Sequence, residues 1–239
     1  MSQQSHMFPY IFFQNNIVKT EDAKVSIMTH ALQYGTGIFG GMRGYYNQEE
    51  KSLSLFRITD HYKRFLQSLH VLSVHFSYSQ KDLEKITIDL IKKNKPKTDV
   101  YFRPFAYEGS LTIAPPLPDN TTFSFALYMV PLGEYLPLNQ GITAMVSSWR
   151  RISDTAIPSR IKASGAYINS ALAKKEARQN GFDEAIFLTE NGHVAEGSAM
   201  NIFIIRDGVL ITPSKTDDIL EGINRKTIIQ IAKDENIPV

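Results

Sequence analysis

The sequence predicts a two-domain protein of mixed α and β structure, in the α+β or α/β class. Its 239 residues are enough for two small domains. Apolar segments typical of strands are interspersed with apolar residues at helical spacing. Turn-forming residues gather after residue 131, as expected of a linker. We therefore expect one domain at 1–131, a linker at 132–138 and a second domain at 139–239.

The first half contains signals for both strands and helices. Apolar runs predict strands at 10–13, 53–56, 100–107 and 121–130. Apolar residues at helical spacing predict a helix that Thr59 or Asp60 caps, and Ser79 with Asp82 resembles the capping box of a second helix. The glycine-rich segment 35–41 lacks the spacing of a dinucleotide fingerprint and the Gly-Lys-Ser/Thr of a P-loop. We expect a turn there.

The second half is richer in turn signals. Asn191-Gly192 and Asp207-Gly208 each separate two short apolar runs, which predicts two hairpins with type I′ turns. Asn180-Gly181 is typical of the end of a helix. The other expected elements are a strand at 141–148, a helix at 167–178 and a last helix that begins near Gly222.

Composition excludes several classes of protein. With 43% hydrophobic and 21% charged residues, the chain is an ordinary globular protein, and a net charge of +2 gives no reason to expect nucleic acid as a partner. The absence of cysteine excludes disulfides and thiolate chemistry and fits a cytoplasmic protein. The six histidines have no metal-ligand spacing. No apolar run is long enough to span a membrane. We expect no metal, no nucleic acid and no membrane partner.

The segment around Lys162 is the most informative part of the chain. Small residues surround this lysine after Pro158, so that a planar molecule could approach its amine. Arg150, Arg151 and Arg160 raise the local positive potential, which favours the neutral amine needed for attack on an aldehyde. The alternative is an ordinary surface lysine, which is the usual fate of any single lysine.

Two further positions suit the same chemistry. Glu196 lies 34 residues after Lys162, between the two hairpins, where a carboxylate could hold a protonated ring nitrogen. Gly222 lies at a helix start, where backbone N–H groups and the helix dipole can bind a phosphate. Each has a simpler alternative: a solvated turn residue for Glu196 and a glycine that only permits a turn for Gly222.

Taken together and in order over residues 10–239, these motifs resemble the fold-type IV pyridoxal phosphate enzymes, and are most similar to the branched-chain amino acid aminotransferases. The segments that carry the resemblance are 21–25, 30–36, 56–57, 101–104, 144–149, 162–167, 196–198 and 201–203. The resemblance implies a small N-terminal α+β domain and a larger, β-rich C-terminal domain that binds the cofactor.

The resemblance also implies how pyridoxal 5′-phosphate is bound. Lys162 would form the Schiff base with the cofactor and then move the proton, Tyr167 would hydrogen-bond the phenolic oxygen, and Glu196 would keep the pyridine nitrogen protonated. Arg57 and the start of the last helix would hold the phosphate, and Leu220 would pack on the ring. The implied cofactor-binding residues are Arg57, Lys162, Tyr167, Glu196, Asn201, Leu220, Gly222, Ile223 and Asn224.

On the substrate side, the resemblance implies transamination between leucine, isoleucine or valine and 2-oxoglutarate. Aromatic residues would accept the branched side chains, and Arg103 would meet the distal carboxylate of glutamate. Gly41 and Arg43 would lie in a loop that completes the pocket, and a homodimer or higher homo-oligomer is expected. The implied substrate-binding residues are Tyr34, Phe39, Gly41, Arg43, Tyr101, Arg103 and Tyr135.

The chain departs from the family pattern at several positions. Ala199, Met200 and Asn224 stand where members usually have Gly, Glu and Thr. Members continue past the position of Val239 to a Gly-Thr-Ala turn that binds phosphate and substrate carboxylate, so we expect a chain that is incomplete at its C-terminus. These departures leave two alternatives: a D-amino acid aminotransferase or aminodeoxychorismate lyase of the same fold, and a non-catalytic fragment.

Overall fold

A computed structural model of the chain describes residues 7–113, 117, 122–133 and 140–239. The chain divides into two compact units, one of residues 1–135 with 162–165, and one of residues 136–161 with 166–239. The expected linker at 132–138 lies largely outside the described residues, so the domain boundaries stay a prediction. The sequence did not predict that 162–165 belongs with the first unit. It does so because Phe39 N donates to Lys162 O and Ile38 forms an isolated β-bridge with Ala163.

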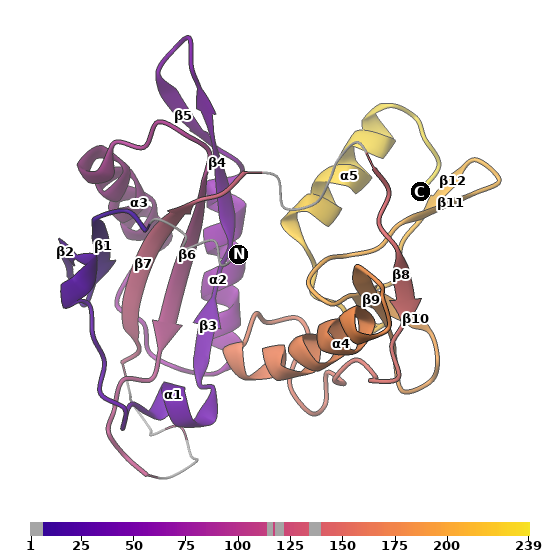
Figure 1. The fold of residues 1–239 in the computed structure, drawn as a ribbon, viewed down its shortest axis with the longest axis horizontal. Helices are drawn as coiled ribbons and strands as arrows, with labels where there is room; N and C mark the ends of the chain where they lie inside the picture. Colours follow the sequence, from indigo (N-terminus) through magenta and orange to yellow (C-terminus); the bar gives the residue numbers. More distant parts are fainter. Residues whose placement is uncertain (1–6, 114–116, 118–121, 134–139) are drawn as a thin grey trace. The chain divides into compact units, whose positions relative to one another are not determined.

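The first unit is built on a seven-stranded antiparallel sheet with the order β2-β1-β7-β6-β4-β5, in which β3 also pairs with β6 (Figure 1). Its strands are β1 Tyr10–Phe13, β2 Asn16–Lys19, β3 Gly37–Phe39, β4 Met42–Asn47, β5 Ser52–Leu55, β6 Val100–Tyr107 and β7 Ser124–Pro131. Its helices are α1 His30–Tyr34, α2 Ile58–Val71 and α3 Gln80–Asn94, with a 3₁₀ turn at Thr20–Asp22. The mixed α and β class expected from the sequence is confirmed.

The side chains of strand β6 alternate between the two faces of the sheet. Its side chains alternate between buried and half-exposed positions, because neighbouring residues of a strand point to opposite faces. Val100 and Phe102 are fully buried, whereas Tyr101 and Arg103 lie on the opposite face. Two residues that the sequence assigned to substrate binding therefore share one face.

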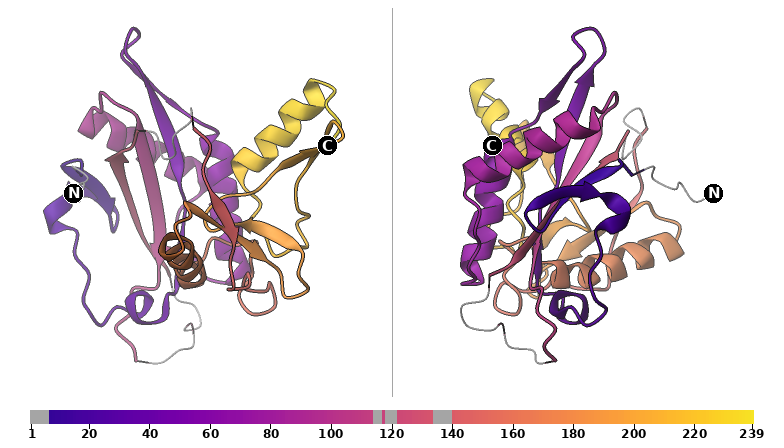
Figure 2. Two further views of the ribbon diagram at one scale, coloured as in Figure 1. Left: turned by 45° about the vertical axis from the view of Figure 1, so that its right-hand side comes forward. Right: turned by 90° about the vertical axis from the view of Figure 1, so that its left-hand side faces the viewer.

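Helices α2 and α3 lie on the same side of this sheet (Figure 2). Phe65 of α2 packs edge-on against Phe125 of β7, with ring centroids 6.0 Å apart. Tyr62 of α2 and Thr87 of α3, both fully buried, share a hydrogen bond of 2.5 Å between their hydroxyls. The core of the unit thus lies between the helices and the sheet.

The start of α2 differs from the prediction. Neither Thr59 nor Asp60 caps the helix: the N-cap is Arg57, in the left-handed conformation with φ 49°. The reason is that both expected caps have other partners. The Thr59 hydroxyl donates to Glu84, and the Asp60 carboxylate accepts from Arg57 Nε at 2.7 Å. The capping box expected at Ser79 and Asp82 is confirmed at the start of α3.

The glycine-rich segment is also more ordered than the expected turn. Residues 37–39 form the buried strand β3, which pairs with the end of β6. The turn is confined to Gly35, which ends α1 with φ 67°. An added Cβ at Gly35 would lie 2.7 Å from Gly165 Cα, so only glycine allows the two backbones to approach this closely.

The described residues of the second unit form a three-stranded sheet, a separate hairpin and two helices. The elements are β8 Ala144–Val146, β9 Glu184–Leu188, β10 Val194–Gly197, β11 Ile204–Arg206, β12 Val209–Ile211, α4 Tyr167–Gln179 and α5 Ile223–Asp234. A 3₁₀ turn at Ser164–Ala166 begins in the first unit and ends at the first residue of this part of the second. Strands β8 and β9 are parallel, and α4 connects them. The core consists of Ala173, Ala177, Ala185, Phe187, Ala195 and Ile219, whose small residues let α4 lie close to the sheet.

Both predicted hairpins are present, but only one has the expected turn. Asp207 and Gly208 have φ of 51° and 76°, as a type I′ turn requires. At the other hairpin only Gly192 has positive φ, and Gly192 N donates to Thr189 O. That connection spans residues 189–193, a longer loop built around an ordinary turn, so the type I′ prediction is wrong there. Among the described residues, no helix has the length and apolar character needed to cross a membrane.

Candidate active site

Lys162 is held at a fixed place in the first unit by backbone contacts on both sides. Its carbonyl accepts from Phe39 N at 3.1 Å. Two residues later, the Ser164 hydroxyl donates to Gly35 O at 2.8 Å, and Gly165 N donates to the same carbonyl at 3.1 Å. The half-buried lysine is therefore anchored to the segment that joins α1 to β3, which restricts where its amine can reach.

The aromatic ring of Phe39 brings two cations together. Lys162 Nζ lies 5.0 Å from the ring centroid, and the guanidinium carbon of Arg103 lies 4.6 Å from it. Both distances are within the range of cation–π attraction. Three of the residues that the sequence assigned to the site, Lys162, Phe39 and Arg103, are thus gathered in one place.

Tyr101 extends this cluster on the same face of the sheet. Its hydroxyl accepts from Arg103 Nη2 at 3.1 Å, and the Arg103 guanidinium also lies 5.2 Å from the Tyr101 ring. Arg103 Nε is buried and has no hydrogen-bond partner among the described residues. A Cβ on Gly41 would lie 2.1 Å from the Tyr101 hydroxyl oxygen, so this glycine makes room for the tyrosine.

Arg43 does not lie in a loop, as the sequence suggested, but in strand β4 opposite Tyr101. Its Nη2 donates to the carbonyls of Leu132 and Gly133 at 3.1 and 2.8 Å. Its guanidinium also lies 5.4 Å from the Tyr45 ring. The backbone pairing of β4 with β6 explains the strand, and the side chain holds the end of the β7 segment.

Arg57 lies at the N-cap of α2 and pairs with Asp60. One turn into the helix is His61, a residue that the sequence analysis considered only as a metal ligand. Its Nδ1 is buried and has no hydrogen-bond partner among the described residues. Burial, together with the positive charges of Arg64 and Lys162, lowers the pKa of His61 from 6.5 to about 3. The available signal was a histidine four residues after the Phe56-Arg57 pair.

Tyr34 ends α1, with its ring tilted against the buried ring of His30 at a centroid distance of 4.6 Å. Its side chain is 38% exposed. The structure therefore places it at the surface of the first unit. Tyr135, the remaining residue assigned to the substrate, lies outside the described residues.

In the second unit, Glu196 is a buried carboxylate at the end of β10. Its Oε1 lies 3.0 Å from Arg151 Nη2 in a salt bridge between two buried side chains. Its Oε2 accepts from Asn201 Nδ2 at 3.0 Å and from Leu220 N at 3.2 Å. The alternative of a solvated turn residue is therefore wrong for Glu196.

The start of α5 lies beside this group. Gly222 is the N-cap and has no side-chain capping bond, and the first helical residues are Ile223 and Asn224. Gly222 N donates to Asn201 Oδ1 at 3.2 Å, and a Cβ on Gly222 would lie 2.2 Å from that oxygen. Asn201 Nδ2 also donates to Leu220 O at 2.9 Å. Asn201 thus joins Glu196 to the helix start, where backbone N–H groups suit an anion.

The remaining predictions for this unit have mixed outcomes. Tyr167 is half-buried and is the first residue of α4. Two of the three arginines expected to raise the potential at Lys162 are paired with acids: Arg151 with Glu196, and Arg160 with Asp154. Their charges are compensated, so that electrostatic argument is wrong for them.

The departure at Met200 has a structural explanation. Gly197 N donates to Met200 O at 2.7 Å, which closes the turn after β10. The residue therefore acts through its backbone, which does not depend on a carboxylate side chain.

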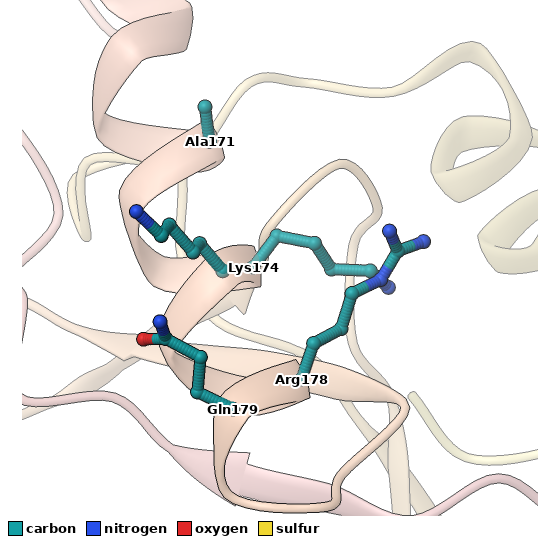
Figure 3. A pocket seen from close by; sticks show the side chains of 5 residues that line it. Ala171, Lys174, Arg178 and Gln179 are labelled. Carbon is teal, nitrogen blue, oxygen red and sulfur yellow. The ribbon is translucent and has the colours of Figure 1, made fainter.

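A hollow of about 400 Å³ on the surface of α4 is a different kind of feature (Figure 3). It is lined by Ala171, Lys174, Lys175, Arg178 and Gln179. Lys174 is already paired with Glu184 at 2.7 Å. None of these residues belongs to the predicted site, and we assign the hollow no role. No group of acids, histidines or cysteines in the described part of the chain could hold a metal ion.

Comparison with known proteins identifies the family of the chain. The family model for class IV amino-transferases matches residues 37–239. The "Probable branched-chain-amino-acid aminotransferase" of Aquifex aeolicus (strain VF5) is 47% identical over 232 residues, which are 97% of this chain and 74% of the relative. The chain therefore belongs to the class IV aminotransferases and, within them, to the branched-chain amino acid aminotransferases.

Solved structures agree with this assignment. The branched-chain aminotransferase of the archaeon Thermoproteus uzoniensis with norvaline has a TM-score of 0.92 and 41% identity, over 97% of this chain and 76% of that one. The enzyme of Thermobaculum terrenum in its PLP-form has a TM-score of 0.89 and 36% identity, over 95% of this chain and 74% of that one. Another solved branched-chain amino acid aminotransferase is complexed with N-(5′-phosphopyridoxyl)-L-glutamate. Members of the family thus bind pyridoxal phosphate or its derivatives.

The residues of this chain fit that cofactor. The first unit supplies an anchored lysine whose amine lies over an aromatic ring. The second unit supplies a buried carboxylate and a helix start whose N-cap provides no side-chain partner. An amine, an acid for a ring nitrogen and an anion site are the three groups that pyridoxal phosphate needs from a protein.

Proposed function

We propose that this chain catalyses transamination between the branched-chain L-amino acids leucine, isoleucine and valine and 2-oxoglutarate, with pyridoxal 5′-phosphate bound through Lys162. The observation that carries the proposal is the cluster in which Lys162 and Arg103 both lie on the Phe39 ring. The relatives named for branched-chain amino acids support the substrate class. The solved complex of a relative with a phosphopyridoxyl derivative of glutamate supports the second substrate.

Each residue has a definite task in this proposal. The Lys162 amine would hold the cofactor through its aldehyde and would move the proton at the substrate Cα. Glu196 would keep the ring nitrogen protonated, and the cofactor, when bound, would supply a ring that can accept electrons from Cα. Tyr167 donates to the phenolic oxygen. Arg57 and the backbone N–H groups of α5 at Ile223 hold the phosphate.

The remaining cofactor residues support these groups. Asn201 orients Glu196 through its Nδ2 hydrogen bond, and Leu220 contacts the ring face. Gly222 and Asn224 flank Ile223 at the helix start and complete the anion site.

On the substrate side, the aromatic rings of Phe39, Tyr101 and Tyr34 accept an aliphatic side chain. Arg103 receives the distal carboxylate of glutamate, and its buried Nε without a partner among the described residues supports this role. The same arginine must be shielded by aromatic faces when leucine binds, and its two ring contacts provide that shielding. Gly41 leaves room for Tyr101, and Arg43 and Tyr135 complete this side.

Reduction with borohydride tests the role of the lysine. Treatment of the cofactor-loaded protein with sodium borohydride should attach the cofactor irreversibly to the peptide that contains Lys162, as peptide mass analysis would detect. Lys162→Ala should show no such attachment. Covalent retention by Lys162→Ala would contradict the proposal.

The alternatives from the sequence are separated by two further measurements. Conversion of bound cofactor to its amine form by L-leucine but not by D-alanine is expected, and turnover of D-alanine alone would favour a D-amino acid aminotransferase. A cofactor titration of the 239-residue protein should reach one equivalent per chain. Absence of binding would favour the non-catalytic fragment.

The protein is also proposed to form a homodimer. An apolar surface formed by exposed side chains of two joined segments of the first unit supports this, since exposed apolar side chains on neighbouring segments suit an interface between chains. Backbone hydrogen bonds from His30 to Ser110 and from Ala31 to Glu108 join the two segments that form it. The surface consists of Val25, Ile27, Met28, Leu32, Leu111 and Ile113, all exposed. The cytoplasmic location expected from the sequence stays a prediction.

A further inference from the structure

Arg151 is tied to three parts of the second unit. Its Nη2 lies 3.0 Å from Glu196 Oε1, its Nε donates to Asp218 O at 3.2 Å, and its backbone N donates to Leu188 O at 2.8 Å. Its guanidinium carbon also lies 5.8 Å from the ring of Phe187, a fully buried residue of the core. The residue is only 7% exposed. The buried guanidinium and the backbone of Arg151 are therefore both held in place by contacts within the second unit.

The contacts of Arg151 close a ring of hydrogen bonds around Glu196. Arg151 binds Glu196 Oε1 and the carbonyl of Asp218, and two residues later Leu220 N donates to Glu196 Oε2. Asn201 links Oε2 to the Leu220 carbonyl. One arginine therefore fixes both the carboxylate and the loop that carries Leu220.

Because the Arg151–Glu196 pair is buried, the positive charge of Arg151 strongly affects whether Glu196 is ionised. A carboxylate removed from water is unfavourable unless a cation and hydrogen bonds compensate it. The Asn201 amide and the Leu220 N–H, which donate to Oε2, are neutral and cannot supply a positive charge in place of Arg151. Removing the arginine takes away this buried salt bridge and so favours the protonated, neutral form of the carboxyl group.

We infer that Arg151 is a positioning residue for the cofactor, which holds Glu196 ionised and oriented so that the proton shared with the cofactor's ring nitrogen stays on the nitrogen. This inference rests on the proposed function. Arg151 touches neither substrate nor cofactor in it and acts through Glu196. When Arg151 is removed, the proton moves from the ring nitrogen to the Glu196 carboxylate, the pyridine becomes neutral, and no other bond changes.

Four variants separate this role from a merely structural one. Arg151→Met removes the charge, Arg151→Lys keeps it, and Arg151→Met with Glu196→Gln removes both charges of the pair. Arg178→Met is the matched control, because Arg178 is exposed on α4 of the same unit and has no ion pair within the described residues. Each is loaded with pyridoxal phosphate labelled with ¹⁵N in the ring, whose chemical shift reports the protonation of that nitrogen.

The expected result is a protonated ring nitrogen in the unmodified protein, in Arg151→Lys and in Arg178→Met, and a neutral one in Arg151→Met. Cofactor affinity of Arg151→Met should fall by about ten- to a hundredfold, the usual effect of removing a residue that orients a ligating side chain. A nitrogen that stays protonated in Arg151→Met would overturn the inference. Failure of the unmodified protein to bind cofactor would instead overturn the proposed function.

Unfolding of the cofactor-free protein supplies the second readout. Arg151→Met should lower the melting temperature, and adding Glu196→Gln should recover most of the loss, because no uncompensated charge then remains buried. Equal losses from Arg151→Met with and without Glu196→Gln would mean that the two side chains are not coupled, which also overturns the inference. The measurement needs no cofactor and decides the pairing even if Arg151→Met binds none.

Discussion

Gly41 illustrates how the absence of one methyl group shapes the substrate side of the first unit. In Gly41→Ala, the new Cβ would lie 2.1 Å from the Tyr101 hydroxyl oxygen, so the tyrosine must move and its hydrogen bond with Arg103 is disturbed. We expect KM for the amino acid to rise by about tenfold, because displacement of a positioning group weakens productive binding. Steady-state kinetics with L-leucine measures this. Gly133→Ala is the control, since no atom of the described residues lies within 4 Å of its added Cβ, and equal kinetics for both variants would contradict the assignment.

His61 should make the unfolding free energy of the protein depend on pH. Burial and the charges of Arg64 and Lys162 hold its pKa at about 3, against 6.5 for an ordinary histidine. The unfolded chain therefore binds one more proton than the folded chain between these two pH values. Stability is then lost as the pH falls from 6.5 towards 3, by at most about 1.4 kcal/mol per pH unit.

Urea unfolding of the protein and of His61→Gln, at several pH values in that window, measures the effect. Glutamine does not titrate, so the difference in unfolding free energy between the two proteins should shrink or reverse as the solution becomes more acidic. A difference that is the same at every pH would contradict the neutral, buried histidine. His70, which is exposed on the same helix, provides the control in His70→Gln.

At the scale of elements, helices α2 and α3 are joined by a hydrogen bond that has no contact with water. Thr87→Val keeps the shape of the side chain but leaves the buried Tyr62 hydroxyl without its partner. We expect a loss of about 2 kcal/mol of unfolding free energy, the cost of an unsatisfied buried polar group. Adding Tyr62→Phe removes that group, so the double variant should recover part of the loss in denaturant unfolding. Additive losses would exclude the coupling.

The same elements separate what the sequence could predict from what it could not. The capping box at Ser79 and the turn at Asp207-Gly208 depend on residues within a few positions of each other, and both were predicted correctly. The cap of α2 was not, because the Thr59 hydroxyl is occupied by Glu84, 25 residues away. Local signals fail where a tertiary partner competes for the same side chain.

In the candidate site too, the sequence predicted single residues but not their distant partners. Lys162 and Glu196 could be proposed because their chemistry is specific and their motifs resemble a known family. The salt bridge of Arg151 with Glu196 joins residues 45 positions apart, and nothing in the sequence relates them. From the sequence, Arg151 was expected to raise the positive electrostatic potential near Lys162. In the structure it forms a salt bridge with the Glu196 carboxylate instead.

At the scale of the whole molecule, the predicted site residues are divided between the two units. The first unit holds Lys162 with the aromatic and arginine side chains, and the second holds Glu196 with the start of α5. Each group is ordered by contacts within its own unit: Lys162 by the backbone near Gly35, and Glu196 by Arg151 and Asn201. Each unit therefore carries a preformed part of the proposed site.

At the same scale, the apolar surface around Ile27 bears on whether two chains assemble into a dimer. If the apolar surface around Ile27 joins two chains, Ile27→Asp should give a monomer, because a charge in the centre of an apolar interface has no compensation. Sedimentation velocity distinguishes monomer from dimer. Ile205→Asp is a closely matched control: Ile205 is 78% exposed and Ile27 is 79% exposed, but Ile205 lies on β11 of the second unit. A monomeric unmodified protein, or a dimer that only Ile205→Asp dissociates, would contradict this interface. Tyr34 is exposed and lies two residues after Leu32 of the same surface, so loss of the dimer should also raise KM for leucine.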